Sequence, residues 1–263
     1  MKRLNFPSVS GFASVGVFIK GFALLILAIV LWSFAGKRQL SKTCNQINVH
    51  LENEEGNYFV DEDQIKDVIS RGRNSLTFMR WYDSISLYKL ERRIEKVDFV
   101  KKAEVSHDLA GNLNVNVRLI KPIARIVSGG SDRDRYVGEE GEILPTSEKY
   151  CAKVITMDGA GARHMIYHPD SNTLQMVRMV EFINDDSFWK AQVSHINIDE
   201  NWNLTLYPLV GNQVIEFGPA TDFKPKFNKL LAFYQRIVPV KGWNTYHKVS
   251  IKFKNQIICE KSS

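Results

Sequence analysis

The stretch FVKKAEVSHDLAGNLNVNVRLIKP, residues 99–122, predicts two strands joined by a tight turn. In both halves apolar residues alternate with polar ones: Ala103, Val105, Leu113, Val115, Val117 and Leu119. This period of two is typical of strands with one buried face. Residues 108–112 are rich in turn formers and predict the connection. Pro122 cannot donate to a strand ladder, so it predicts the end of this unit.

The residues before this hairpin predict one strand and two helices. Residues 47–51 alternate as a strand does, and Asp61 is a suitable N-cap for a helix, with Gln64 placed to complete a capping box. A second helix is indicated by apolar residues at helical spacing: Leu87, Leu90, Ile94 and Val97. Residues 45–121 therefore predict a small domain with the order strand, helix, helix, strand, strand.

Residues 122–263 predict a second and larger α+β domain. Strands are expected at 135–148 as a hairpin, at 153–159, and at 195–208 as a hairpin that turns over residues 199–203. A helix over residues 173–185 is expected to bury one face, formed by Leu174, Val177, Val180 and Ile183. Another helix is expected over residues 226–238. Strands mixed with a few helices indicate an α+β unit.

The C-terminal stretch VSIKFKNQIICEKSS, residues 249–263, predicts a last pair of strands with a turn at Lys254 and Asn255. The second of these strands, expected over residues 256–259, would be an open edge of the sheet with unpaired backbone groups. Such an edge can accept a strand from a partner protein. We expect the partner-binding residues to be Tyr246, Ile251, Phe253, Gln256, Ile257, Ile258 and Cys259. The alternative is an ordinary edge that is protected from aggregation by Lys248, Lys252 and Lys254.

Near the N-terminus, VGVFIKGFALLILAIVLWSFA, residues 15–35, contains a single charge, Lys20. As a helix it would extend about 30 Å and cross a bilayer core. No small-residue cleavage pattern precedes Lys37 and Arg38, so a membrane anchor at residues 15–36 is favoured over a signal peptide. Positive charges are balanced on the two sides of this segment and leave its orientation open.

Composition excludes several classes of function. The net charge of +6 over 263 residues is mild, and no run rich in Lys and Arg indicates nucleic-acid binding. The three cysteines, Cys44, Cys151 and Cys259, are widely spaced and form no CxxC pair. They therefore predict neither a disulfide framework nor a zinc or redox motif.

Candidate catalytic residues are few. His164 and His168 have the spacing of a metal-binding pair on a helix, but Pro169 and the glycines before them favour a surface loop. Cys151 lacks the sequence surroundings of a nucleophile, and we expect it to be a small buried residue. Asp134, in the segment DRDR, is expected to be neutralised by the adjacent arginines. We therefore predict no enzyme activity, no metal and no cofactor.

The order of segments resembles the FtsQ/DivIB family of cell-division proteins. The resemblance is carried by NYFVDEDQI, residues 57–65, and by IEKVDFVKKAEVSHDLAGNLNVNVRLIKPIARI, residues 94–126, which are similar to a POTRA (polypeptide-transport-associated) domain. The strand, glycine turn and Leu-Pro step within residues 135–148 are similar to the second domain of that family. The similarity extends over essentially the whole chain.

The resemblance implies a non-enzymatic scaffold of the division machinery at the septum. It implies a cytoplasmic N-terminus (1–14), a single transmembrane helix (15–36) in the inner membrane, and a periplasmic POTRA domain (45–121) and β domain (122–263). It also implies binding to FtsB- and FtsL-like coiled-coil membrane proteins, with FtsB on the last strand, and control of septal peptidoglycan synthesis. Neither a small-molecule substrate nor nucleic acid is expected as a partner.

A second partner surface is expected on the POTRA domain. The stretch NSLTFMRWYDS, residues 74–84, contains aromatic residues near two arginines, and Arg73, Arg80 and Trp81 are the candidates for binding other division proteins. The alternative is that Phe78, Met79 and Trp81 close the domain core. Two other functions remain open: a POTRA protein of protein export or assembly, and an envelope enzyme built around His164, His168 or Cys151.

Overall fold

A computed structural model of the chain describes residues 25–27, 29, 46–52, 58–70, 86–108, 110–129 and 133–261. The predicted membrane anchor at residues 15–36 lies outside this part, except for four helical residues with exposed side chains, Leu25, Ile26, Leu27 and Ile29. Among the described residues, no helix is both long enough and apolar enough to cross a membrane.

The first domain is a three-stranded sheet with two helices. The strands are β1 (Ile47–Glu52), β2 (Val100–His107) and β3 (Leu113–Leu119), and their order is β1-β3-β2. β1 runs parallel to β3, so the chain must cross over between them, and α2 (Glu62–Ser70) and α4 (Leu87–Ile94) lie in this crossover. The apolar residues of both helices are buried with those of β3 in one core: Ile65, Ile69, Leu90, Ile94, Leu113, Val115 and Val117. The predicted order of elements is confirmed.

The second domain contains a nine-stranded sheet with the order β12-β11-β10-β9-β8-β7-β4-β5-β6. Its strands are β4 (Pro122–Ile126), β5 (Arg135–Gly138), β6 (Ile143–Pro145), β7 (Ile155–Asp158), β8 (Val193–Ile198), β9 (Leu204–Pro208), β10 (Val214–Gly218), β11 (Tyr246–Ser250) and β12 (Ile258–Lys261). Its helical segments are α5 (Gly159–Tyr167), α6 (Ser171–Asp185), α7 (Ser187–Gln192), α8 (Phe223–Ala232), the π-helical η3 (Phe233–Ile237) and α9 (Val238–Lys241). The predicted α+β class is confirmed for both domains.

The helices of this domain share one core with one face of the sheet. Ala124, Ile155 and Ile196 are buried on that face, together with residues of α5 to α8 and η3. On the opposite face, Arg125 and Thr156 are paired in register and point away from this core. On α6, Val177, Val180 and Ile183 of the expected face are buried, but the side chain of Leu174 is 50% exposed. The buried face of the helix also includes Thr173, Met176 and Met179.

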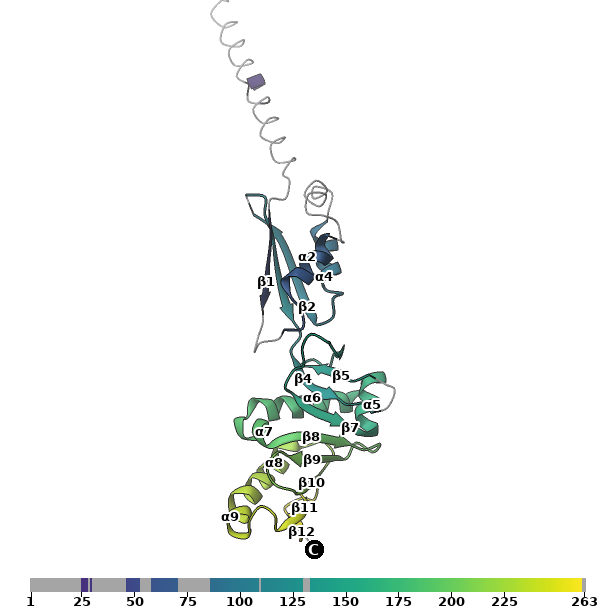
Figure 1. Cartoon of the computed structure of the whole chain (residues 1–263), viewed down its shortest axis with the longest axis vertical. Helices are drawn as coiled ribbons and strands as arrows, with labels where there is room; N and C mark the ends of the chain where they lie inside the picture. Colours follow the sequence, from purple (N-terminus) through teal and green to yellow (C-terminus); the bar gives the residue numbers. More distant parts are fainter. Residues whose placement is uncertain are drawn as a thin grey trace, which may run out of the picture.

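The two domains lie end to end (Figure 1). Side chains of the second domain are buried in the core of the first. Tyr136 of β5 and Leu144 of β6 are buried in the core of the first domain. There the rings of Phe59 and Phe99 stack with centroids 4.0 Å apart, and the ring of Tyr136 lies 5.2 Å from that of Phe59. The hydrophobic core of the first domain therefore extends past Pro122, the residue at which its last strand was expected to end.

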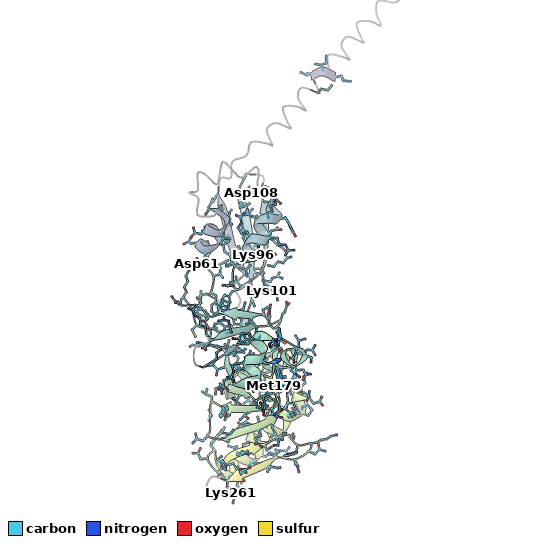
Figure 2. The ribbon with its side chains drawn as sticks, turned by 90° about the vertical axis from the view of Figure 1, so that its right-hand side faces the viewer. Asp61, Lys96, Lys101, Asp108, Met179 and Lys261 are labelled. Carbon is cyan, nitrogen blue, oxygen red and sulfur yellow. The ribbon has the colours of Figure 1, made fainter. Side chains whose placement is uncertain are left out.

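Ion pairs surround this aromatic junction. Lys149 Nζ lies 2.8 Å from Asp61 Oδ2, and Lys101 Nζ lies 2.7 Å from Glu139 Oε1. Figure 2 shows Asp61 and Lys101 at the level where the two domains meet, while Lys261 lies at the far end of the second domain. Because these pairs join residues from both domains, they oppose rotation of one domain against the other.

Candidate partner-binding edge

β12 is the last strand at one end of the nine-stranded sheet. It pairs antiparallel with β11, so that Ser250 faces Ile258 and Val249 faces Cys259. Among the described residues no strand lies on its other side, and Figure 1 shows β12 at the end of the molecule farthest from the first domain. The outward backbone groups of β12 are therefore available to another strand.

The hairpin that forms this edge differs from the prediction in the bounds of its two strands. β11 ends at Ser250, and β12 begins at Ile258, two residues later than the expected start at Gln256. The turn contains Asn255 at φ +60°, a left-handed conformation that asparagine adopts more readily than most residues. Ile251, directly after β11, still donates its backbone N–H to Glu216 of β10 (3.0 Å), so the chain leaves the sheet after this residue.

The seven predicted partner-binding residues fall into two groups. Ile251 is fully buried, and Tyr246, Ile257 and Cys259 are partly buried against the domain core, so these four support the hairpin from inside. The exposed residues are Gln256, Phe253 and Ile258, of which the last two have 42% of their surface exposed. Only this second group offers side chains to a partner.

The lysines expected to protect the edge are partly engaged in ion pairs. Lys248 Nζ lies 2.8 Å from Glu216 Oε1 and 3.5 Å from Glu260 Oε1, so this lysine links β10, β11 and β12. The hydrogen bond with Lys248 lowers the pKa of Glu216 and raises that of Lys248. Lys252 Nζ is 3.5 Å from the same Glu216. These pairs are partly exposed to solvent and individually weak, and they all join neighbouring segments at this edge of the sheet.

Lys229 of α8 fastens the hairpin to the helix layer, a role that sequence analysis missed. Its Nζ donates to the carbonyl oxygen of Ile251 (2.5 Å) and also to that of Phe253. Burial lowers the pKa of this lysine. In the sequence Lys229 looks like any polar position of an amphipathic helix, so no local pattern indicates this contact.

The two histidines lie in different surroundings from those expected. His164 is within α5 and His168 directly follows it, so the surface loop predicted here is wrong; the helix forms in spite of its glycines. Their ring centroids are 5.4 Å apart, and the ring of His164 also lies 5.7 Å from that of Trp202. Within the described part of the chain, no group of three or more His, Cys, Asp or Glu residues could hold a metal ion.

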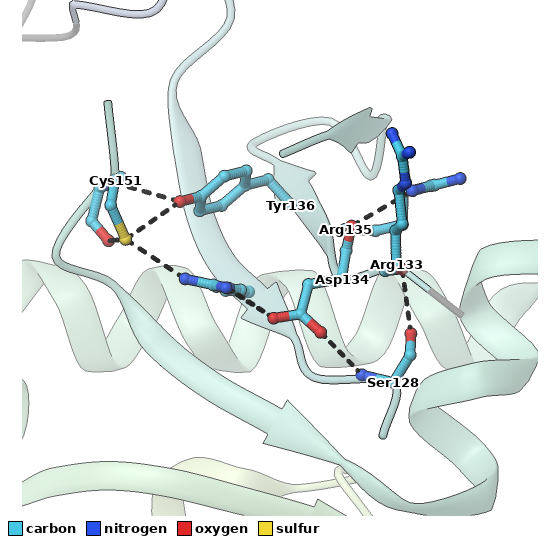
Figure 3. Close-up of polar contacts among 8 residues, drawn as sticks. Ser128, Arg133, Asp134, Arg135, Tyr136 and Cys151 are labelled. Atoms are coloured by element: carbon cyan, nitrogen blue, oxygen red, sulfur yellow. Dashed lines mark hydrogen bonds and ion pairs between the residues drawn. The ribbon is translucent and has the colours of Figure 1, made fainter. Parts of the chain in front are cut away.

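Cys151 is exposed, which corrects the expectation that it is buried. Arg125 Nη1 and the hydroxyl of Tyr136 both donate to its Sγ, at 3.2 and 3.6 Å, as Figure 3 shows. Arg125 also donates to the Asp134 carboxylate (2.6 Å), so this carboxylate pairs with an arginine nine positions away, whereas its neighbour Arg135 donates only to the backbone carbonyl of Asp134. The contacts of Cys151 and those of His164 share no residue, so these groups do not form one catalytic site.

Some predicted residues lie outside the described part of the chain. Arg73, Arg80 and Trp81, the candidate binding residues of the first domain, are among them, as are Phe78 and Met79. The surface expected around residues 73–84 therefore stays a prediction.

Comparison with known proteins agrees with this architecture. A POTRA-like domain model matches residues 42–118, and the model described as FtsQ/DivIB, C-terminal related, matches residues 121–260, more than half of the chain. No curated protein matches. The fold and the matches define a protein with a POTRA-like domain followed by a larger mixed domain that ends in an open sheet edge. The chain belongs to the FtsQ/DivIB family, which confirms the resemblance found in the sequence.

Proposed function

We propose that this protein is a non-enzymatic, membrane-anchored scaffold of bacterial cell division that binds its partner by strand addition to β12. The observation that carries the proposal is that no other described strand pairs with the outer side of β12, in a domain matched by the FtsQ/DivIB model. An added strand would gain affinity from backbone hydrogen bonds and specificity from alternate side chains. Phe253 and Ile258 are the exposed apolar residues beside it.

The proposed partners are small coiled-coil membrane proteins of the FtsB and FtsL type, with FtsB on the edge. The proposed location is the inner membrane at the division septum, with residues 1–14 in the cytoplasm and the domains at 45–121 and 122–263 in the periplasm. The nearly uncharged stretch of residues 15–35 supports the anchor. Through this complex the protein would help to control septal peptidoglycan synthesis.

The decisive experiment is the binding of purified full-length protein to an FtsB–FtsL-type complex. In an antiparallel pair successive residues alternate between inward and outward hydrogen bonding, so one of Ile258 and Cys259 directs its N–H outward. Proline at that position should abolish binding while β11 and the rest of the domain stay folded, because only the outward donor is lost. Proline at the other position breaks a bond to β11 and serves as the comparison.

A deletion variant tests strand addition at β12 without introducing a proline. A chain that lacks residues 256–263 should remain folded, because the core residues Val249 and Ile251 precede the deletion, and it should lose binding. If the truncated protein is folded and binds as tightly as the full chain, strand addition at β12 is wrong.

We also propose that Arg73, Arg80 and Trp81 form a recruitment surface of the POTRA-like domain. Charge reversal at Arg73 and Arg80 should reduce the localisation of a fluorescent fusion at the septum, because a partner of opposite charge would then be repelled. Circular dichroism of the purified variant should be unchanged. Normal localisation of a folded variant would exclude this surface.

A further inference from the structure

A pocket separate from the outer side of β12 lies between the start of α8 and the connection from β11 to β12. Its volume is about 370 Å³, and four lysines, one carboxylate and one aromatic ring line it: Lys226, Lys229, Lys252, Lys254, Asp222 and Phe253. We call it the lysine pocket. Its residues come from two segments about twenty-five positions apart in the chain, so only the folded hairpin brings them together.

Positive charge in the lysine pocket is poorly compensated. Lys252 is 3.5 Å from Glu216, but in the described part of the chain no carboxylate lies within ion-pair distance of Lys226, Lys229 or Lys254. Lys226 Nζ and Lys229 Nζ instead donate to carbonyl oxygens, those of Pro219 and Ile251, each at 2.5 Å. These bonds hold both ammonium groups in place without neutralising them.

The pKa shifts of the two partly buried lysines, Lys226 and Lys229, agree with this geometry. Burial lowers the pKa of Lys226, and the nearby positive charge of Lys229 lowers it further. Burial also lowers the pKa of Lys229. A lowered pKa means that the charged form of each lysine is disfavoured, and an anion placed between the two ammonium groups would stabilise that form.

We propose that the lysine pocket binds a phosphate group carried by an organic molecule. A phosphate offers several strong acceptor oxygens to several ammonium groups at once, and lysine binds it as a point charge. No arginine lines this pocket, so a bound anion would be held by ammonium groups, which act as point charges from several directions. The ring of Phe253 supplies an apolar wall for the organic part of the ligand.

The start of α8 adds a favourable field. The helix has ten residues, and its N-cap residue Asp222 makes no side-chain capping hydrogen bond. The positive end of the helix dipole therefore lies at the pocket without a side-chain cap, and helix N-termini attract anions. Asp222 itself opposes an anion, but it is one carboxylate against four ammonium groups.

The test is isothermal titration of the full-length protein, purified in a neutral detergent, with three probes: inorganic phosphate, glycerol 3-phosphate and a short-chain phosphatidylglycerol. Lys254→Gln removes one exposed ammonium group of the pocket and should weaken binding roughly fivefold. Lys226→Gln should weaken it as well, but it also removes the bond to Pro219. Lys224→Gln is the matched control, because Lys224 is exposed on the same helix and does not line the pocket.

The probes also distinguish two sources of the phosphate. Binding of glycerol 3-phosphate alone identifies a soluble phosphate ester, and preferential binding of phosphatidylglycerol identifies a lipid headgroup. The proposal is overturned if none of the probes binds, or if Lys224→Gln weakens binding as much as Lys254→Gln. It is also overturned if a tetraglutamate peptide binds more tightly than every phosphate, since the pocket would then be a carboxylate site.

Discussion

Asp61 shows how one side chain links local structure to the arrangement of the domains. Its Oδ1 accepts the backbone N–H of Gln64 (2.7 Å) and so caps α2, as the sequence predicts. Its Oδ2 accepts a hydrogen bond from Lys149 Nζ of the second domain (2.8 Å). The hydrogen bond from Lys149, followed by that from Gln64, lowers the pKa of Asp61.

A pH-dependent stability follows at this residue. Because the pKa is lower in the folded state, the contribution of Asp61 is present above the unfolded value of about 3.9 and is lost as the pH falls through the folded value. Asp61→Asn should therefore destabilise the protein at pH 7, and the difference from the wild type should disappear in acid. Urea unfolding from pH 7 to pH 2.5 measures this. A difference that is equally large at both ends of the range would show that the charge of Asp61 contributes nothing.

At the scale of elements, the hairpin of β11 and β12 is shaped by contacts outside itself. The ion pairs of Glu216 with Lys248 and Lys252 tie the hairpin to β10. The hydrogen bond from Lys229 ties the segment between β11 and β12 to α8. β12 has only four residues, Ile258–Lys261, and a strand this short has few ladder bonds of its own. Its position at the sheet edge therefore depends on these anchors.

Lys229→Met tests this dependence. It keeps much of the side-chain volume and removes the donor to Ile251 and Phe253, so the hairpin should open more often while the core of the domain is unchanged. Hydrogen exchange of the amides in residues 249–261 should accelerate by roughly tenfold, as expected when about 1–1.5 kcal/mol of bonding to a charged donor is lost. Lys224→Met, on the same helix, should leave the exchange unaltered. Equal protection in both variants would mean that Lys229 does not hold the hairpin.

On the scale of the whole molecule, the two domains are joined by a common core. Tyr136 is 1% exposed; it belongs by sequence to the second domain and packs among Phe59 and Phe99 of the first. Its hydroxyl accepts the N–H of Ala152 (3.2 Å) and donates to Cys151. A partner that binds β12 would therefore act on a molecule whose two domains move together.

Unfolding experiments test this coupling. The wild type should unfold in one calorimetric transition, because the core of the first domain is completed by Tyr136 and Leu144 of the second. Tyr136→Ala should lower the free energy of unfolding by about 3–5 kcal/mol and divide the transition into two. The matched control is Tyr207→Ala, which removes a tyrosine that is 38% exposed on another strand and should have little effect. A single transition in Tyr136→Ala would show that the junction is held by other contacts.

Local patterns in the sequence determined the elements and much of their burial. The alternation of Leu113, Val115 and Val117 predicts β3, and the cap at Asp61 predicts the start of α2. The turn over residues 199–203 is also correct, because the backbone N–H groups of Asn201 and Asn203 both donate to the Asp199 side chain. In each case the features that form the element lie within one turn or one strand, so the local sequence is enough to predict them.

Only the tertiary structure decided how distant segments meet. Tyr136 enters the core of the first domain, Lys229 reaches the hairpin from α8, and Ile251 donates its backbone N–H to Glu216 of β10. The sequence pattern around each of these residues is explained by its own helix, strand or turn. It would be the same if the distant contact did not exist. The periodicity of apolar residues indicates which face of a helix or strand is buried. It does not indicate which other segment covers that face, because this depends on the packing of the whole chain.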